Sequence, residues 1–171
     1  MSSINLEEHC GCENKEEADL LFRDYIGTTR ALQLWFHAAH HVTRGAGFVG
    51  DHIHLYGELY TKIEEDIDVV IEKAMSILED EMIACPVSIT RHAAEILQHY
   101  PSPSGHTSLG IAASGKTLLS GYLEYLEFLR DSLKEAGALT LGLEDHIAST
   151  ANNYESFLYM LQQREKSELQ N

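Results

Sequence analysis

Residues 37–72 read HAAHHVTRGAGFVGDHIHLYGELYTKIEEDIDVVIE, and no other segment says as much about how the chain folds. Five of the ten histidines lie within the first eighteen positions of this segment, and a run of carboxylates follows them. Apolar residues recur at intervals of three and four on both sides of a glycine-rich break at 44–47. The pattern predicts two helices that bring the histidines together at the turn between them.

The same helical spacing continues outward along the chain. Gly45 is expected to cap the first helix, and Asp51 is expected to cap the start of the second. All three prolines lie between 86 and 103, and Pro86 is expected to start a short helix that ends near Gln98. The long helices are predicted over about 16–42, 51–80, 108–136 and 140–166.

Four long amphipathic helices with a long middle connection predict an all-α protein. A connection that travels the length of the bundle is typical of the ferritin-like four-helix bundle, here with a short extra helix between helices two and three. The predicted organisation is a flexible acidic N-terminal tail over 1–15, the bundle over 16–167 and a C-terminal tail over 168–171.

The composition excludes several functional classes. A formal charge of −15 on 171 residues argues against nucleic-acid binding, which rests mostly on Lys and Arg neutralising phosphates. No stretch approaches the roughly 20 apolar residues that cross a bilayer, and residues 1–17 lack the regions of a signal peptide. Three cysteines form no even framework, which fits a reducing compartment. We therefore expect a cytoplasmic protein with no membrane partner.

A polar stripe runs along the second predicted helix, and such a stripe by itself is more often a solvated face. The histidines at the end of the first helix favour a metal site over a solvated face. Imidazole and carboxylate together form the ligand set of iron, zinc or manganese. The candidate metal ligands are His37, His40, His41, His52, His54, Glu58, Asp68 and Glu72.

The segment resembles the signature of the Dps family, the small dodecameric branch of the ferritins. That signature runs from a histidine at a helix end, through Lys/Arg-Gly and a phenylalanine, to a second histidine twelve positions on. It finishes with an acidic helix ending Asp-x3-Glu. The matching residues here are His40, Arg44-Gly45, Phe48, His52 and Asp68-x3-Glu72. The motif covers positions 32–75, and the helix order extends the resemblance over nearly the whole chain.

The resemblance implies a di-iron ferroxidase centre at a twofold interface between subunits. Its catalytic residues would be His40 and His52 of one subunit with Asp68 and Glu72 of its neighbour. Twelve copies would form a cage in which hydrogen peroxide or dioxygen oxidises Fe(II) and the Fe(III) is stored as mineral. Family members often bind DNA through basic tails, but residues 1–17 hold one lysine against five acidic residues. DNA binding is therefore expected to be weak or absent.

One position departs from the family's pattern. An acidic ligand usually follows the second histidine by four residues. This chain has Tyr56 there, or Gly57 if one extra residue precedes the helix. Neither replaces a carboxylate, so we expect a histidine-rich centre in which His54 substitutes and His37 or His41 adds a further ligand. More imidazole favours softer divalent ions, so zinc is expected to compete with iron.

Two other functions stay open: a non-catalytic shell that holds zinc, and an oxygen-binding di-iron bundle of hemerythrin type, suggested by His54-x3-Glu58. The tail residues His9, Cys10 and Cys12 form a soft-metal set that several tails together could complete. Four acidic residues flank the last turn, where they line a pore or are simply solvated: Asp131, Glu135, Glu144 and Asp145. Of the remaining histidines, His146 is expected to be structural. The other three are expected to be exposed, namely His92, His99 and His106.

Overall fold

The computed structural model describes residues 14–166, which contain helices and turns but no strand. The four long helices are α1 (Lys15–Val42), α2 (Glu58–Leu78), α4 (Ser108–Glu135) and α5 (Leu141–Lys166). The shorter elements are a π-helical segment (Gly50–Gly57), a 3₁₀ turn (Glu81–Ala84) and helix α3 (Pro86–Leu97). The predicted tails lie outside the described residues, apart from positions 14 and 15, and so do His9, Cys10 and Cys12.

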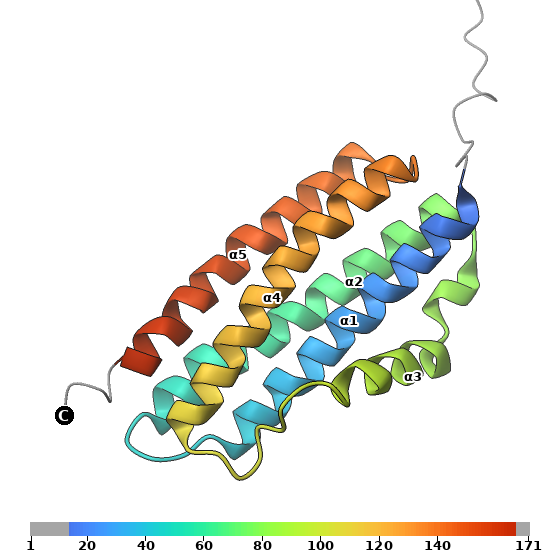
Figure 1. The fold of residues 1–171 in the computed structure, drawn as a ribbon. Helices are drawn as coiled ribbons and strands as arrows, with labels where there is room; N and C mark the ends of the chain where they lie inside the picture. The colour runs from blue at the N-terminus through green and yellow to red at the C-terminus, as the bar shows by residue number, and fades with distance from the viewer. Residues whose placement is uncertain (1–13, 167–171) are drawn as a thin grey trace, which may run out of the picture.

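The four long helices form a bundle of two antiparallel hairpins, α1 with α2 and α4 with α5 (Figure 1). The connection between the hairpins runs back along the bundle, so that α2 and α4 are parallel (Figure 1). Helix α3 belongs to this connection and packs against α1. The predicted all-α, ferritin-like bundle with an extra helix in its long connection is therefore confirmed.

Local chemistry determines where several elements begin and end. Pro86 occupies the first turn of α3, where its missing N–H breaks no helical hydrogen bond. The Thr107 hydroxyl accepts the N–H of Gly110 at 3.1 Å and caps α4. Gly137, at φ 70°, follows the C-terminal end of α4 in the left-handed region that glycine tolerates best. The Trp35 indole donates to the carbonyl of Pro101 at 2.6 Å and so ties the loop after α3 to α1.

The core between the long helices is largely apolar, and several of its polar side chains bond to one another. The Tyr154 hydroxyl of α5 donates to the buried carboxylate of Asp66 on α2 at 2.8 Å. The Lys62 ammonium lies 3.1 Å from the other oxygen of that carboxylate. The Thr29 hydroxyl of α1 lies 2.6 Å from the Tyr122 hydroxyl of α4. Since burial raises the pKa of both tyrosines well above the ordinary value, their hydroxyls stay protonated.

Two predicted helix caps are wrong. Helix α1 ends at Val42 with Thr43 extended, and Gly45 lies beyond it in the loop at φ 90°. Asp51 caps no helix, because the second predicted helix is divided at its start. Residues 50–57 form a π-helix in which Asp51 is buried, and the α-helix begins only at Glu58.

One histidine expected to be exposed is half-buried instead. The His92 ring packs against the backbone of Gly27, where a Cβ atom would lie only 2.0 Å from the ring. Its Nε2 lies 3.1 Å from a carboxylate oxygen of Asp24. Helix α3 docks on α1 through this contact, which periodicity alone does not predict. None of the helices within 14–166 is long and apolar enough to cross a membrane.

Candidate metal centre

His40 and His52 face each other where α1 ends and the π-helical segment begins. Their rings are stacked, with centroids 3.7 Å apart and planes at 18°. His40 Nδ1 lies 2.7 Å from the carbonyl oxygen of His52, and His52 Nδ1 lies 2.8 Å from the carbonyl oxygen of His40. Because a carbonyl only accepts, both Nδ1 atoms carry the proton. With Nδ1 engaged in this way, Nε2 is the atom of each ring that is left to bind a metal ion, which is the arrangement of metal-binding histidines.

The aromatic residue of the loop between α1 and the π-helical segment holds the second of these rings in place. Phe48 stacks on the His52 ring with centroids 4.8 Å apart and planes at 22°. The His52 ring thus lies between Phe48 and His40, with its Nδ1 already bonded. A ring held on both faces loses little rotational freedom when a metal ion binds, so the pair is organised before binding.

The π-helical turn explains the extra residue expected before the second helix. A π-helix accommodates one more residue per turn than an α-helix would, and such turns are frequent at functional sites. The turn places Gly57 directly against the first histidine. A Cβ atom at Gly57 would lie 2.6 Å from the His52 carbonyl oxygen and 3.4 Å from His40 Nδ1. The position that faces the histidines is therefore Gly57, and the backbone leaves no room there for a carboxylate side chain.

Tyr56, the other candidate for the missing ligand, points into the bundle. Its ring is fully buried and stacks on Phe36 with centroids 6.4 Å apart. Burial raises the pKa of its hydroxyl, and the nearby Asp51 carboxylate raises it further. A neutral phenol in the core is not a metal ligand at ordinary pH.

A buried ion pair fixes the start of the π-helical segment. Arg164, near the end of α5, donates through Nε to both carboxylate oxygens of Asp51, at 3.0 and 2.9 Å. The Arg164 guanidinium also packs against Gly47, where a Cβ atom would lie 2.9 Å from it. The loop that carries Phe48 and the turn that carries His52 are therefore both held by α5.

Two further pairs form among the predicted ligands. His37 and His41, one turn apart on α1, bring their Nε2 atoms within 3.1 Å of each other. His54 Nδ1 lies 3.0 Å from a carboxylate oxygen of Glu58, and both side chains are exposed. Across residues 14–166, however, no three His, Cys, Asp or Glu side chains converge on one point. His54 therefore does not complete the His40–His52 pair within one chain.

The predicted carboxylate ligands lie farther along the bundle. Asp68 and Glu72 are exposed on α2 and, being four residues apart, share one face of the helix. Sixteen residues separate His52 from Asp68, a distance of about 20 Å along the helix axis. A side chain does not span this distance, so one chain alone cannot bring the two sets together.

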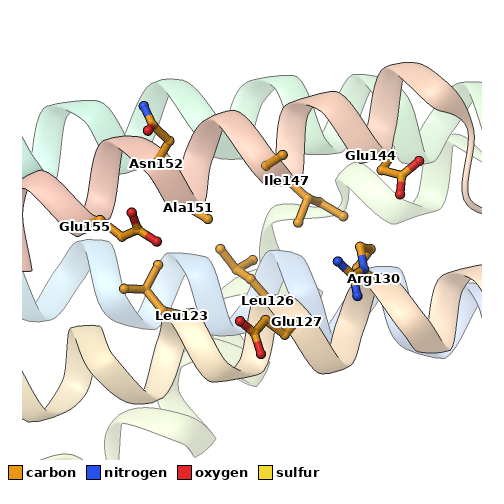
Figure 2. A pocket seen from close by; sticks show the side chains of 10 residues that line it. Leu123, Leu126, Glu127, Arg130, Glu144, Ile147, Ala151, Asn152 and Glu155 are labelled. Atoms are coloured by element: carbon orange, nitrogen blue, oxygen red, sulfur yellow. The ribbon is translucent and has the colours of Figure 1, made fainter.

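Of the four acidic residues near the last turn, Glu144 alone lines a separate hollow. A groove of about 400 Å³ lies between α4 and α5, with Leu126 and Ile147 among its apolar lining (Figure 2). Glu144 and Arg130 lie near one end of the groove (Figure 2). None of the predicted metal ligands lines it. A pore would form only between several subunits. Both interpretations of Glu144, as a pore residue and as a solvated charge, therefore stay predictions.

Known structures with the same helix arrangement are similar over most of the chain. The tetragonal form of Mycobacterium smegmatis Dps has a TM-score of 0.72 at 18% identity, over 94% of this chain and 92% of that one. The fold is that of the Dps proteins. Another structure of Mycobacterium smegmatis Dps gives the same TM-score and identity over 94% and 87% of the two chains. A Dps protein from Bacillus brevis gives 0.70 at 20% identity over 86% and 94%. No family model and no curated protein sequence matches this chain.

In this Dps fold the histidines and the predicted acidic ligands form two separate groups on one chain. His40 and His52 lie at the turn between α1 and α2, and the Asp68–Glu72 pair lies in the middle of α2. The expected four-residue spacing between the second histidine and an acidic ligand is replaced by the π-helical turn.

The sequence did not lead us to expect the ion pair that positions the π-helical turn. Asp51 looks like an ordinary helix cap, and Arg164 looks like one of the balanced charges of the C-terminal segment. The composition offers one signal for this ion pair. A buried aspartate needs a cationic partner, and the chain has only 12 Lys and Arg residues from which that partner can come. Choosing Arg164 among them requires the packing of α5, 113 residues away in sequence.

Proposed function

We propose that this chain is a mini-ferritin subunit that oxidises Fe(II) with hydrogen peroxide or dioxygen and stores the Fe(III) as mineral in a dodecameric cage. The observation that carries the proposal is the reciprocal hydrogen bonding of His40 and His52, which leaves both Nε2 lone pairs for a metal ion. The similarity to Dps structures supports the same class of function.

The centre is proposed to form between two subunits. In a twofold dimer the same surface patch meets itself, and with the twofold axis perpendicular to α2 each α2 helix runs antiparallel to its copy. His40 and His52 of one subunit would then face Asp68 and Glu72 of the partner subunit, about 20 Å along the helix from the equivalent histidines. Each dimer would hold two such centres, with His54 and Glu58 beside them as further ligands.

The substrate chemistry follows from this ligand set. Imidazole nitrogens bind Fe(II), and carboxylates stabilise the additional positive charge of Fe(III). Two Fe(II) ions give two electrons to one hydrogen peroxide, which takes up two protons and yields two water molecules and two Fe(III). The residues of the chain bind and orient the two ions, and the Nδ1 bonds of the histidines keep the rings fixed. A charge of −15 per subunit attracts Fe(II) towards the assembled shell.

A subunit-mixing experiment tests the shared site. Oligomers of His52→Ala alone and of Asp68→Ala alone are expected to oxidise Fe(II) slowly, as followed by iron absorbance with peroxide and with air. After dissociation and equal mixing, half of the dimers contain one subunit of each kind, and one of their two centres is intact. About a quarter of the wild-type rate should return. Glu124→Gln, which changes an exposed carboxylate on α4, is the control and should oxidise iron at the wild-type rate.

Two results would contradict the proposed shared centre. If mixing restores no activity although the two variants co-assemble, the centre is not shared between subunits. A wild-type rate in His52→Ala would contradict the proposal as a whole. Size-exclusion chromatography addresses the hemerythrin-like alternative, because twelve chains of 19.2 kDa elute at about 230 kDa and a monomeric bundle does not.

The second candidate is the non-catalytic zinc-holding shell. Gly57 in place of a carboxylate favours it, because the loss of negative charge weakens the preference for Fe(III). Iron loading in the presence of zinc separates the two functions. A ferroxidase shows iron oxidation that zinc inhibits, and a zinc shell binds zinc without oxidising iron.

A further inference from the structure

The second histidine pair, His37 and His41, has the geometry of a chelating site. The two Nε2 atoms are 3.1 Å apart and the ring centroids 4.6 Å. Zn(II) binds imidazole nitrogen at about 2.0–2.1 Å, so two nitrogens of a tetrahedral ion lie about 3.3 Å apart, and two at a right angle lie about 2.9 Å apart. The observed separation falls between these values. The two nitrogens share a hydrogen bond in the structure, and an ion that takes the place of its proton can bind both at this spacing.

Neighbouring rings hold the pair in this arrangement. The Tyr60 ring of α2 lies against His37 with centroids 4.5 Å apart. The His40 ring meets His41 nearly edge-on, with centroids 5.1 Å apart and planes at 70°. His41 is exposed and His37 half-buried, so an ion can reach the nitrogens from solvent. A pair that is already ordered loses little conformational entropy when the ion binds.

The pair is separate from the proposed iron centre. His40 and His52 are tied to each other through their Nδ1 atoms, whereas His37 and His41 meet through Nε2. The ring centroids of His37 and His40 lie 6.3 Å apart, and no three potential ligands converge within residues 14–166. Five neighbouring histidines thus divide into two pairs and the outlying His54, instead of forming one cluster.

We infer that His37 and His41 form a second metal site, which takes a borderline divalent cation such as Zn(II) or Cu(II). Two imidazoles without a carboxylate favour these ions over Fe(II), in line with the general order of divalent affinities. The site lies near the C-terminal end of α1, where the helix dipole favours a positive charge. Water completes the coordination. Both ligands come from one chain, so the site does not depend on the proposed iron chemistry.

Zinc titration of the assembled protein by isothermal calorimetry, with bound ion counted by equilibrium dialysis, tests this site. His41→Ala should remove one class of bound zinc, about one ion per chain, with at least a tenfold loss of affinity. His41→Cys should retain it, because a thiolate at the same position is also a zinc ligand. The matched control is His99→Ala, which removes an exposed imidazole outside the pair and should bind zinc like the wild type.

The variants also distinguish this site from the proposed ferroxidase centre. His52→Ala should oxidise iron slowly and still bind the zinc of the His37–His41 pair. If His41→Ala binds zinc with wild-type stoichiometry and affinity, the second site does not exist. If His52→Ala abolishes the same class of zinc ion that His41→Ala removes, the histidines form a single shared site and the inference is wrong.

Discussion

The ion pair between Asp51 and Arg164 should be one of the most sensitive points of the structure, because it joins the end of α5 to the π-helical turn that carries His52. Replacing Arg164 with Met removes the charge and keeps most of the apolar stem. The Asp51 carboxylate, whose side chain is 6% exposed, then stays buried without its partner. Such a change typically costs 3–5 kcal/mol. The Arg164 side chain is 15% exposed, so we expect the lower end, about 3 kcal/mol.

In a chain of this length, 1 kcal/mol shifts the melting temperature by about 2–4 °C. Arg164→Met should therefore melt about 6–12 °C below the wild type in far-ultraviolet circular dichroism. The matched control is Lys116→Met, which breaks the pair with Glu165 that joins α4 to the same end of α5. About a third of each side chain is exposed in that pair, so its loss should cost only about 0–1 kcal/mol.

The double variant Asp51→Asn with Arg164→Met isolates the effect of the unpaired buried charge on stability. It should be less destabilised than the sum of the two single changes, because no unpaired carboxylate is left. Iron oxidation should fall in Arg164→Met at temperatures where the protein is folded, since the turn that holds His52 loses its anchor. If Arg164→Met melts no lower than Lys116→Met, the ion pair does not organise this turn and the reasoning is refuted.

Three further predictions concern the site and the bundle. Gly57→Ala should lower stability by about 1–3 kcal/mol and slow iron oxidation, because its Cβ would lie 2.6 Å from the His52 carbonyl oxygen. Gly121→Ala, on an open face of α4, should be neutral or stabilising in the same melt, and equal effects would contradict the proposed crowding. Burial lowers the pKa of His146, so the unfolded chain binds that proton more tightly and stability should fall as pH drops through about 6.5. The melting temperature of His146→Gln should therefore fall less than that of the wild type between about pH 7.5 and 5.5, and parallel curves would exclude this role. Duplex DNA should show no electrophoretic shift at moderate salt, because a charge of −15 repels phosphate, and a retained complex would overturn that expectation.

Three of the four long helices could be predicted from the sequence almost to the residue, whereas the second, expected over 51–80, is an α-helix only over Glu58–Leu78. The helix expected over 108–136 is Ser108–Glu135, and the one expected over 140–166 is Leu141–Lys166. Their apolar residues recur at helical spacing throughout, and Pro86, Thr107 and Gly137 mark boundaries by local chemistry alone. Information of this kind lies within a few residues of each position, so it is available without the fold.

The close pairing of His40 and His52 could be anticipated, but its hydrogen bonding could not. The motif spacing brings the two histidines to one turn, and the structure adds the reciprocal Nδ1 bonds to backbone carbonyls. Which carbonyl a ring meets depends on the path of the backbone at the turn. That path contains a π-helix, although residues 51–57 fit an ordinary helical pattern equally well.

By itself, the sequence determined the helices, their order and the histidines gathered at one turn, because periodicity, capping and spacing are local properties. Only the tertiary structure decided that Asp51 is an anchor and not a cap, and that Gly57 closes the position where a carboxylate was expected. It also decided that the neighbouring histidines form separate pairs. The Asp51 anchor and the His40–His52 pair depend on contacts between different elements, and such contacts exist only once α1, α5 and the π-helical turn have packed together.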